Sequence, residues 1–136
     1  MGQARQKMLE AGKIIKFDFA KPEFHITRAD REWLQKNPDG TASEERVQSR
    51  ATRFAIGQIV AAAFPQGMDR KDGKTWAAWQ EILDDESTDT MEVNKGMVSW
   101  LSGVIAKEDL KVQPAMAQWR EVLVDYLAAD ESDAAE

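Results

Sequence analysis

The chain has 136 residues, no cysteine, a formal net charge of −6 and a sequence pI near 4.9. This length fits one domain with its own core, and the lack of cysteine excludes disulfides, thiolate metal sites and a cysteine nucleophile. The longest stretch without a charged residue, 54–68, is interrupted by Pro65 and falls short of the roughly 20 apolar residues that span a bilayer. We therefore expect a cytoplasmic protein without a membrane segment or an export signal.

The charge is divided unevenly along the chain. Residues 1–74 hold 14 Lys/Arg against 10 Asp/Glu, a balance of +4, whereas residues 75–136 hold 4 against 14, a balance of −10. Such an asymmetry is typical of proteins with charged partners or of chains with charged tails, because like charges on one surface create a potential that an opposite surface neutralises. The split therefore indicates charged partners or tails, but it does not identify a partner.

The N-terminal segment predicts one helix and two strands. Residues 3–11 are rich in helix formers, and Gly12 supplies a stop. Apolar residues then alternate with period two over 15–19 and again over 24–26, on either side of Pro22. This pattern favours a small β-hairpin that must pack on a helical layer, since an isolated hairpin is marginally stable.

Two helices follow, each with a recognisable N-cap. Thr27 opens a short helix through Leu34 that ends at the turn 37–40, and Ser43 caps a long helix that Pro65 ends. The stretch 54–64 is almost entirely apolar, so we expect the second half of the long helix to be buried nearly all round and to form the centre of the core.

The acidic half predicts three further helices. A loop over 65–74 leads to a helix from Thr75 with Trp76, Trp79 and Leu83 on one face and Gln80, Glu81 and Asp84 turned away. An acidic linker over 84–90 precedes the clearest amphipathic period in the chain, carried by Val93, Met97, Trp100, Leu101, Val104 and Ile105. Pro114 suits the first turn of the last helix.

Together these elements predict a mainly α, single-domain bundle of five to six helices with a small N-terminal β-hairpin. The domain covers 1–129, with the N-terminal helix and the hairpin in 1–27, and 130–136 form a flexible acidic tail.

Catalytic, metal and cofactor motifs are absent from the sequence. No phosphate-binding, dinucleotide, zinc-protease or serine-hydrolase signature occurs, and the calcium-loop spacing around Asp69, Asp72 and Gly73 fails at its first and twelfth positions. His25 is the one histidine, and alternation places it on the outer side of a strand. We expect a non-enzymatic protein without a cofactor.

Three arginines form a candidate contact for nucleic acid or an acidic partner. Arg46, Arg50 and Arg53 fall at i, i+4 and i+7, so they line one side of the long helix and could contact successive phosphates. The alternative is a solvated face on which neighbouring acids pair with these arginines. The low pI of the chain favours this alternative.

The acidic half offers a candidate contact for a basic partner. The residues are Asp84, Asp85, Glu86, Asp89 and Glu92. They could imitate phosphates. Asp84, Asp85, Glu86 and Asp89 could also gather a cation loosely, but an acidic solvated linker is the favoured explanation of this cluster.

Five tryptophans, at 33, 76, 79, 100 and 119, are a high number for 136 residues; core packing is the favoured role for any one of them, and we expect one or two at an interface. Trp33, on a short helix beside the hairpin, and Trp76, next to a loop, are the candidates for an interface, where tryptophan is enriched.

The sequence thus favours a protein that acts through protein–protein contacts, as an adaptor or assembly component, by self-association or with a protein partner and without a membrane. Two alternatives stay open: a nucleic-acid-binding regulator that uses the arginines, and an acidic inhibitor that mimics nucleic acid.

Overall fold

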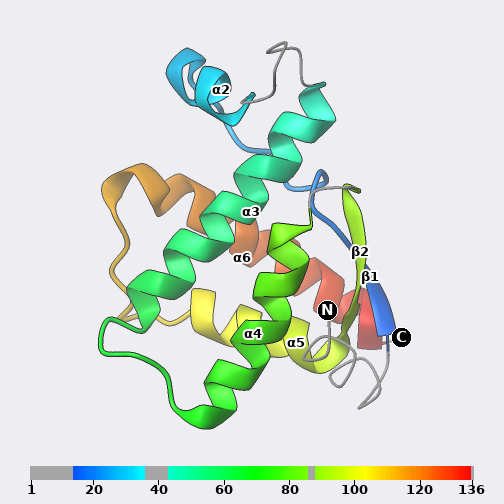
Figure 1. The fold of residues 1–136 in the computed structure, drawn as a ribbon, viewed down its shortest axis with the longest axis vertical. Helices are drawn as coiled ribbons and strands as arrows, with labels where there is room; N and C mark the ends of the chain where they lie inside the picture. Colours follow the sequence, from blue (N-terminus) through cyan, green and yellow to red (C-terminus); the bar gives the residue numbers. More distant parts are fainter. Residues whose placement is uncertain (1–13, 36–42, 86–87, 136) are drawn as a thin grey trace.

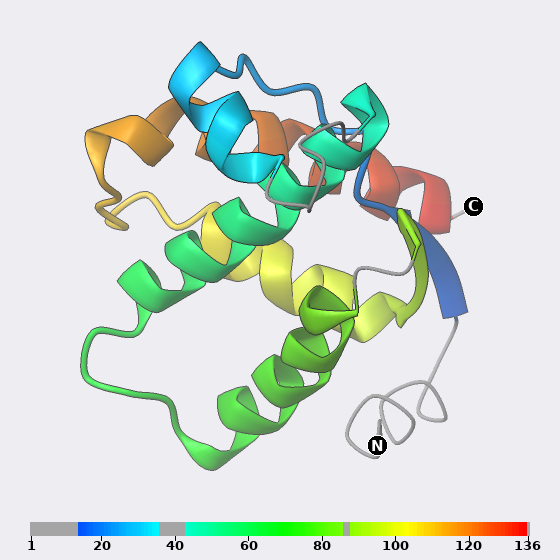
Figure 2. The ribbon, with the colours of Figure 1, turned by 45° about the horizontal axis from the view of Figure 1, so that its top comes forward.

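The computed structural model describes residues 14–35, 43–85 and 88–135, with side chains through residue 128. Within these residues the chain forms five helices and two strands (Figures 1 and 2). Their bounds are β1 Ile14–Asp18, α2 Arg28–Leu34, α3 Glu44–Ala63, α4 Arg70–Asp84, β2 Thr90–Asn94, α5 Lys95–Ile105 and α6 Pro114–Ala135. The prediction of a mainly α fold with one small antiparallel sheet is confirmed. The predicted helix over 3–11 and the turn over 37–40 lie outside the described residues.

The sheet joins segments that are far apart in the sequence. The predicted N-terminal strand is present as β1, but it pairs with β2, in the register Ile15 with Val93 and Phe17 with Met91, and not with residues 24–26 (Figure 1). The prediction that 15–19 pairs with 24–26 was therefore wrong. The strand β2 begins at Thr90, which the sequence placed in the acidic linker. Phe17, Met91 and Val93 are buried, so the sheet covers the core with one face.

Residues 24–26 do not form a strand, and both main-chain groups of Phe24 are bound to a side chain instead. The Phe24 N–H donates to Gln48 Oε1 at 2.9 Å, and Gln48 Nε2 donates to the Phe24 carbonyl at 3.2 Å. One amide side chain thus supplies both hydrogen bonds that a neighbouring strand would have supplied. His25 is exposed, as expected, but in an extended segment without a strand partner.

Three of the predicted helix starts, at Thr27, Ser43 and Pro114, are confirmed and two are displaced. Thr27 Oγ1 accepts from the Asp30 N–H, and Ser43 Oγ accepts from the Arg46 N–H. The next helix begins at Arg70 with Asp69 as its N-cap, five residues before the predicted Thr75, so Gly73 lies inside it. Asn94 caps α5, which places Val93 in the strand and outside the helical period.

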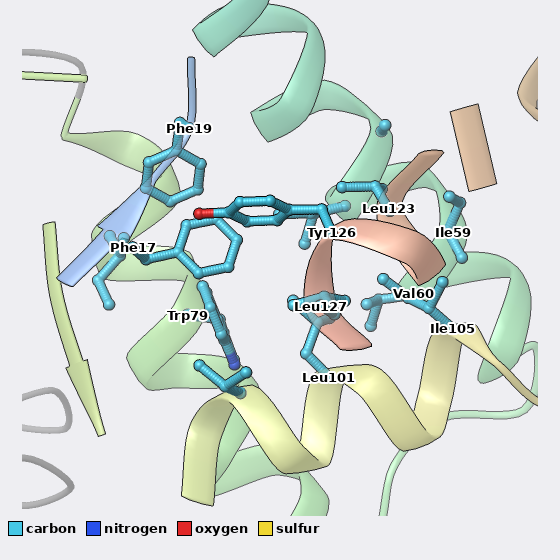
Figure 3. Packing of buried hydrophobic residues seen from close by; sticks show 14 of the residues in the cluster. Phe17, Phe19, Ile59, Val60, Trp79, Leu101, Ile105, Leu123, Tyr126 and Leu127 are labelled. Atoms are coloured by element: carbon cyan, nitrogen blue, oxygen red, sulfur yellow. The ribbon is translucent and has the colours of Figure 1, made fainter. Parts of the chain in front are cut away.

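The core lies between α3, α5, α6, the inner face of α4 and the sheet (Figure 3). Phe17 packs edge-on against Trp79 and Tyr126, with ring centroids 5.4 and 5.2 Å away, and Trp79 donates its indole N–H to the Met97 carbonyl. The Tyr126 hydroxyl accepts the Asp18 N–H at 3.0 Å, which ties β1 to α6.

Two arginines stabilise the C-terminal ends of neighbouring helices. Arg53 on α3 donates to the carbonyls of Ile82 and Leu83 at the end of α4, and Arg120 on α6 donates to the Ile105 carbonyl at the end of α5 and to the loop that follows. Neither α4 nor α5 has a basic residue in its own last turn. The guanidinium groups therefore supply the positive charge that the carbonyl end of a helix favours.

Among the helices of the described residues, none combines the length and the hydropathy that crossing a membrane requires. The last helix continues through Ala135, so its backbone includes most of the predicted tail. The flexibility of 130–136 stays a prediction.

Candidate functional site

The candidate site is a groove bordered by α2, α3 and α4, here called the α3–α4 groove, with a volume of about 460 Å³. The helices α3 and α4 run in opposite directions, and α2 lies beside the first half of α3 (Figures 1 and 2). The groove lies along the part of α3 that the sequence predicts to be buried nearly all round. That prediction was wrong: Gln58 and Ala61 are exposed, and Phe54, Gly57 and Phe64 are half-buried.

The floor of the groove is one face of α3. Arg50, Phe54, Gly57 and Gln58 line it at i, i+4, i+7 and i+8, the spacing of a single helix face. Gly57 leaves this face open, because a Cβ built there meets no atom within 4 Å. A side chain added at position 57 would therefore extend into open space.

The wall opposite is provided by α4, through Trp76, Gln80, Leu83 and Asp84. The buried face of α4 is instead Thr75, Ala78, Trp79 and Ile82. Trp76 and Leu83 thus lie at the margin of the core, half-buried, beside the polar residues that were expected to face away from them. Of the three residues predicted to share one face, Trp79 is fully buried, and Trp76 and Leu83 are half-buried and pack against the core.

Trp33 closes the groove on the side of α2 and is 46% exposed. Its ring packs edge-on against Phe54, with centroids 4.8 Å apart. Trp33, Leu34 and Phe54 also line a second hollow of about 270 Å³, whose other wall includes Met116 and Trp119 on α6. The Trp33–Phe54 pair therefore borders both hollows.

Two polar contacts hold the short helix α2, and with it Trp33, against α3. Arg31 forms a salt bridge with Glu44 in the first turn of α3, and Arg50 Nη1 donates to the Leu34 carbonyl at 2.8 Å. The hydrogen bond from Arg31 lowers the pKa of the Glu44 carboxyl and, by the same contact, raises the pKa of Arg31. These bonds fix one end of α2 without covering Trp33.

Trp76 also belongs to an aromatic cluster with Trp100 and Phe64, which do not line the groove. Its ring lies 6.3 Å from that of Trp100, which stacks on Phe64 at 6.1 Å with an interplanar angle of 7°. Trp100 donates its indole N–H to Asp72 in the first turn of α4. Both predicted interface tryptophans, 33 and 76, therefore border the same groove, on separate helices.

The three arginines of the predicted contact, Arg46, Arg50 and Arg53, bind groups of this same chain. Arg53 is 6% exposed, donates to the carbonyls of Ile82, Leu83 and Thr88, and lies 4.2 Å from the centroid of the Phe19 ring. Its partners include these backbone carbonyls, the aromatic ring and the Ser49 hydroxyl, to which Arg53 Nε donates at 3.4 Å.

Arg46 and Arg50 are half-buried and also engaged. Arg46 forms an ion pair with Asp89 at 3.4 Å, and Arg50 contacts the end of α2. The three side chains therefore do not make one exposed basic surface.

The predicted acidic run is divided among different surroundings. Asp84 and Asp85 are exposed at the end of α4, Asp89 is half-buried beside Arg46, and Glu92 lies on the outer face of β2 opposite Lys16. Glu86 lies outside the described residues. No group of three or more His, Asp or Glu side chains in the described part of the chain is placed to hold a metal ion. Of this run, Asp84 alone lines the groove.

The chain matches no protein-family model, and no curated protein or solved structure matches it either. The candidate site therefore depends on geometry. Sequence reasoning missed Phe54, Gly57 and Leu83 as lining residues. A signal was present at Gly57, because a glycine in the middle of an apolar helix either permits a close approach or marks a face that nothing covers.

Proposed function

We propose that the protein is a non-enzymatic interaction protein, an adaptor or assembly component, that docks part of a protein partner in the α3–α4 groove. The observation that carries this proposal is the placement of Trp33 and Trp76, from two separate helices, on the border of one groove of about 460 Å³. Tryptophan is enriched at interface hot spots.

The groove has the chemistry of a docking surface more than that of a catalytic pocket. Apart from Arg50 and Arg53, its floor and wall are aromatic, aliphatic and amide side chains, and among the residues that the structure describes Asp84 supplies the one carboxylate. General acid–base or nucleophilic catalysis requires a base and an orienting group in mutual hydrogen-bond reach, and no histidine lines the groove.

The two alternatives from sequence receive less support. A nucleic-acid contact through the arginines requires donors that face outward, whereas Arg53 is 6% exposed and bonds to carbonyls. Mimicry of nucleic acid requires a continuous acidic surface, and the predicted run is split between the end of α4 and the strand β2.

The proposal is tested by selecting peptides from a random display library on the wild-type protein and measuring their affinity for the double variant Trp33→Ala/Trp76→Ala. We expect at least a tenfold loss of affinity, because truncating hot-spot tryptophans typically costs about 2 kcal/mol or more. Ile14→Ala is the matched control: Ile14 is the other exposed large apolar residue among those described, and it does not line the groove.

Thermal melting of each variant keeps a binding loss distinct from unfolding. If every selected peptide binds the folded double variant as tightly as the wild type, the groove is not the docking site and the proposal fails.

A further inference from the structure

We infer that the second hollow, between α2, α3 and α6, is a binding site for a quaternary ammonium group, carried by a small molecule or by a trimethylated lysine side chain. This hollow, here called the α2–α6 hollow, has a volume of about 270 Å³. That volume lies below the roughly 300–1,000 Å³ of pockets for drug-sized ligands, so a compact group fits it. The lining includes the aromatic rings of Trp33, Phe54 and Trp119 together with Asp30, Leu34 and Met116.

The hollow collects one face of each of two helices beside a third. On α2, Asp30, Trp33 and Leu34 fall at i, i+3 and i+4, and on α6 Met116 and Trp119 fall at i and i+3. Both spacings place side chains on one face of a helix. The helix α2 and the first turns of α6 lie on the same side of α3 (Figures 1 and 2). The two faces therefore meet beside the middle of α3, which supplies the third aromatic ring.

The three aromatic rings are steeply inclined to one another. The Phe54 ring makes an angle of 67° with that of Trp33 and of 81° with that of Trp119, with centroids 4.8 and 6.3 Å apart. A stacked pair would cover one face of each ring, whereas an edge-on pair covers a face of one ring only. The face of an aromatic ring carries the negative part of its quadrupole and attracts a cation that lies within about 6 Å of its centroid.

The charge in the hollow also favours a cation. Asp30 supplies a carboxylate, and among the described residues no lysine, arginine or histidine lines the hollow. The neighbouring Arg28 pairs with Glu32, and Arg31 pairs with Glu44. In this respect the hollow differs from the α3–α4 groove, which two arginines line. A carboxylate beside aromatic faces is a combination that attracts positive charge.

The start of α6 borders the hollow as well, and the N-terminal end of a helix by itself disfavours a cation. This opposing effect is reduced because Pro114 carries no N–H and the Met116 N–H donates to the Gln113 carbonyl at 2.8 Å. Met116 also offers an adaptable, polarisable thioether, which suits contact with N-methyl groups.

The scarcity of hydrogen-bond acceptors selects an ammonium ion without N–H groups. A primary ammonium has three N–H donors, and burial is costly for each one that finds no acceptor. Within the described lining Asp30 is the one carboxylate, and the Leu34 carbonyl already accepts from Arg50 Nη1 at 2.8 Å. A quaternary ammonium has no donor to satisfy, and its methyl groups bury apolar area against the rings.

The test follows binding to the isotope-labelled full-length protein by NMR, through the indole N–H signals of its five tryptophans. Choline is the probe, and its two analogues are the alcohol in which carbon replaces the charged nitrogen, and ethanolamine, a primary ammonium. The ionic strength is held constant with NaCl. We expect choline to shift the Trp33 and Trp119 signals to saturation, and both analogues to bind at least tenfold more weakly.

A capped trimethyllysine distinguishes the two sources of the group. If it binds more tightly than choline, the ligand is a side chain of a protein; if choline binds more tightly, the ligand is a free small molecule. Either order supports the site, because both compounds present the same trimethylammonium group.

Variants locate the bound cation, and thermal melting shows whether each is folded. Trp33→Leu keeps an apolar side chain at an exposed position but removes the ring, so the affinity for choline should fall at least tenfold. Trp76→Leu removes a ring that lines the α3–α4 groove but not the hollow, and should leave the affinity unchanged. Asp30→Asn should weaken choline at least threefold but not the neutral alcohol. Glu32→Gln, an equal change of charge on α2 outside the lining, should weaken neither.

The inference is overturned if the neutral alcohol or ethanolamine binds the wild-type protein as tightly as choline, because the hollow then does not select a quaternary ammonium. It is also overturned if choline shifts no tryptophan signal beyond the shift caused by NaCl, or if Trp76→Leu weakens choline as much as Trp33→Leu. The two hollows share the Trp33–Phe54 pair, but none of these results depends on a docked peptide. The proposed function and this inference can therefore fail separately.

Discussion

Arg53 offers the sharpest test of how the helices are joined, through the substitution Arg53→Met. The side chain is 6% exposed and donates to three carbonyls, those of Ile82 at 2.5 Å, Leu83 at 3.1 Å and Thr88 at 2.9 Å. Methionine keeps an unbranched apolar stem next to Phe19 but removes every donor. The end of α4 and the connection to β2 then lose the group that binds them to α3.

The expected loss follows from how deeply each carbonyl is buried. The bond to Ile82 is buried, and its carbonyl would keep only the Asp85 N–H at 3.2 Å, so losing the charged donor there costs about 1–3 kcal/mol. The bonds to Leu83 and Thr88 are partly buried, so water can bind these two carbonyls in the variant and offset part of the loss. We expect a total loss of about 2–4 kcal/mol, and about half of it for Arg53→Lys, because an ammonium cannot reach three separate carbonyls.

Urea unfolding followed by circular dichroism measures this loss as a difference in the free energy of unfolding at unchanged m-value. The control is Arg28→Met, because Arg28 has a side chain 94% exposed and pairs only weakly with Glu32 at i+4; its change should stay within about 0.5 kcal/mol. If the two variants differ by less than about 0.5 kcal/mol, the carbonyl contacts do not stabilise the end of α4 and the reasoning is refuted.

Three further predictions follow from individual contacts. Gly57→Ala should raise the free energy of unfolding by about 0.5–1 kcal/mol in urea melts, because the added methyl meets no neighbour and removes a helix-interior glycine; a destabilised variant would contradict this. Trp79→Phe should cost about 2–4 kcal/mol in the same assay, since it leaves a cavity in the core and removes the buried hydrogen bond from the indole N–H to the Met97 carbonyl; a loss below 1 kcal/mol would exclude this contribution. The pKa of Glu44, measured by carboxyl NMR titration, should lie below its ordinary value and return to it in Arg31→Gln. The salt bridge then stabilises the fold above the unfolded-state pKa of Glu44, and this effect is lost as the pH falls through the folded-state pKa. Equal pKa values of Glu44 in the two proteins would rule out this salt bridge as the cause.

The sequence predicted the helices whose signals are local. Thr27 and Ser43 cap the helices that they were expected to cap, because a hydroxyl needs only the N–H groups of the next turn. The displaced start of α4 has a local cause as well: Gly73 suggested a loop, yet Asp69 caps a helix that tolerates this glycine. The error arose from a single residue type whose effect on helix stability is only about 1 kcal/mol.

Non-local contacts could not be predicted from the sequence. The alternation over 24–26 is the pattern of a strand, but the Gln48 amide, on another element, occupies the main-chain groups that a strand partner needs. The groove was missed for a related reason. An apolar stretch such as 54–64 indicates how much surface prefers burial, whereas the packing of neighbouring helices decides which side is covered. Trp33 and Trp76 were identified by their places beside connecting segments, and their common groove emerged only in three dimensions.

The pairing of β1 with β2 sets the order in which the chain can complete its fold during synthesis. Asp18 pairs with Thr90 and its N–H binds the hydroxyl of Tyr126, so β1 leaves the ribosome long before either partner exists. At about 5–20 residues per second, the wait for β2 is about 4–15 s, during which Phe17 and Phe19 have no sheet partner and no finished core to enter. A nascent chain shorter than about 90 residues therefore exposes an apolar strand, and we expect chaperone binding or aggregation at that stage of translation and release from it once β2 and α6 have emerged.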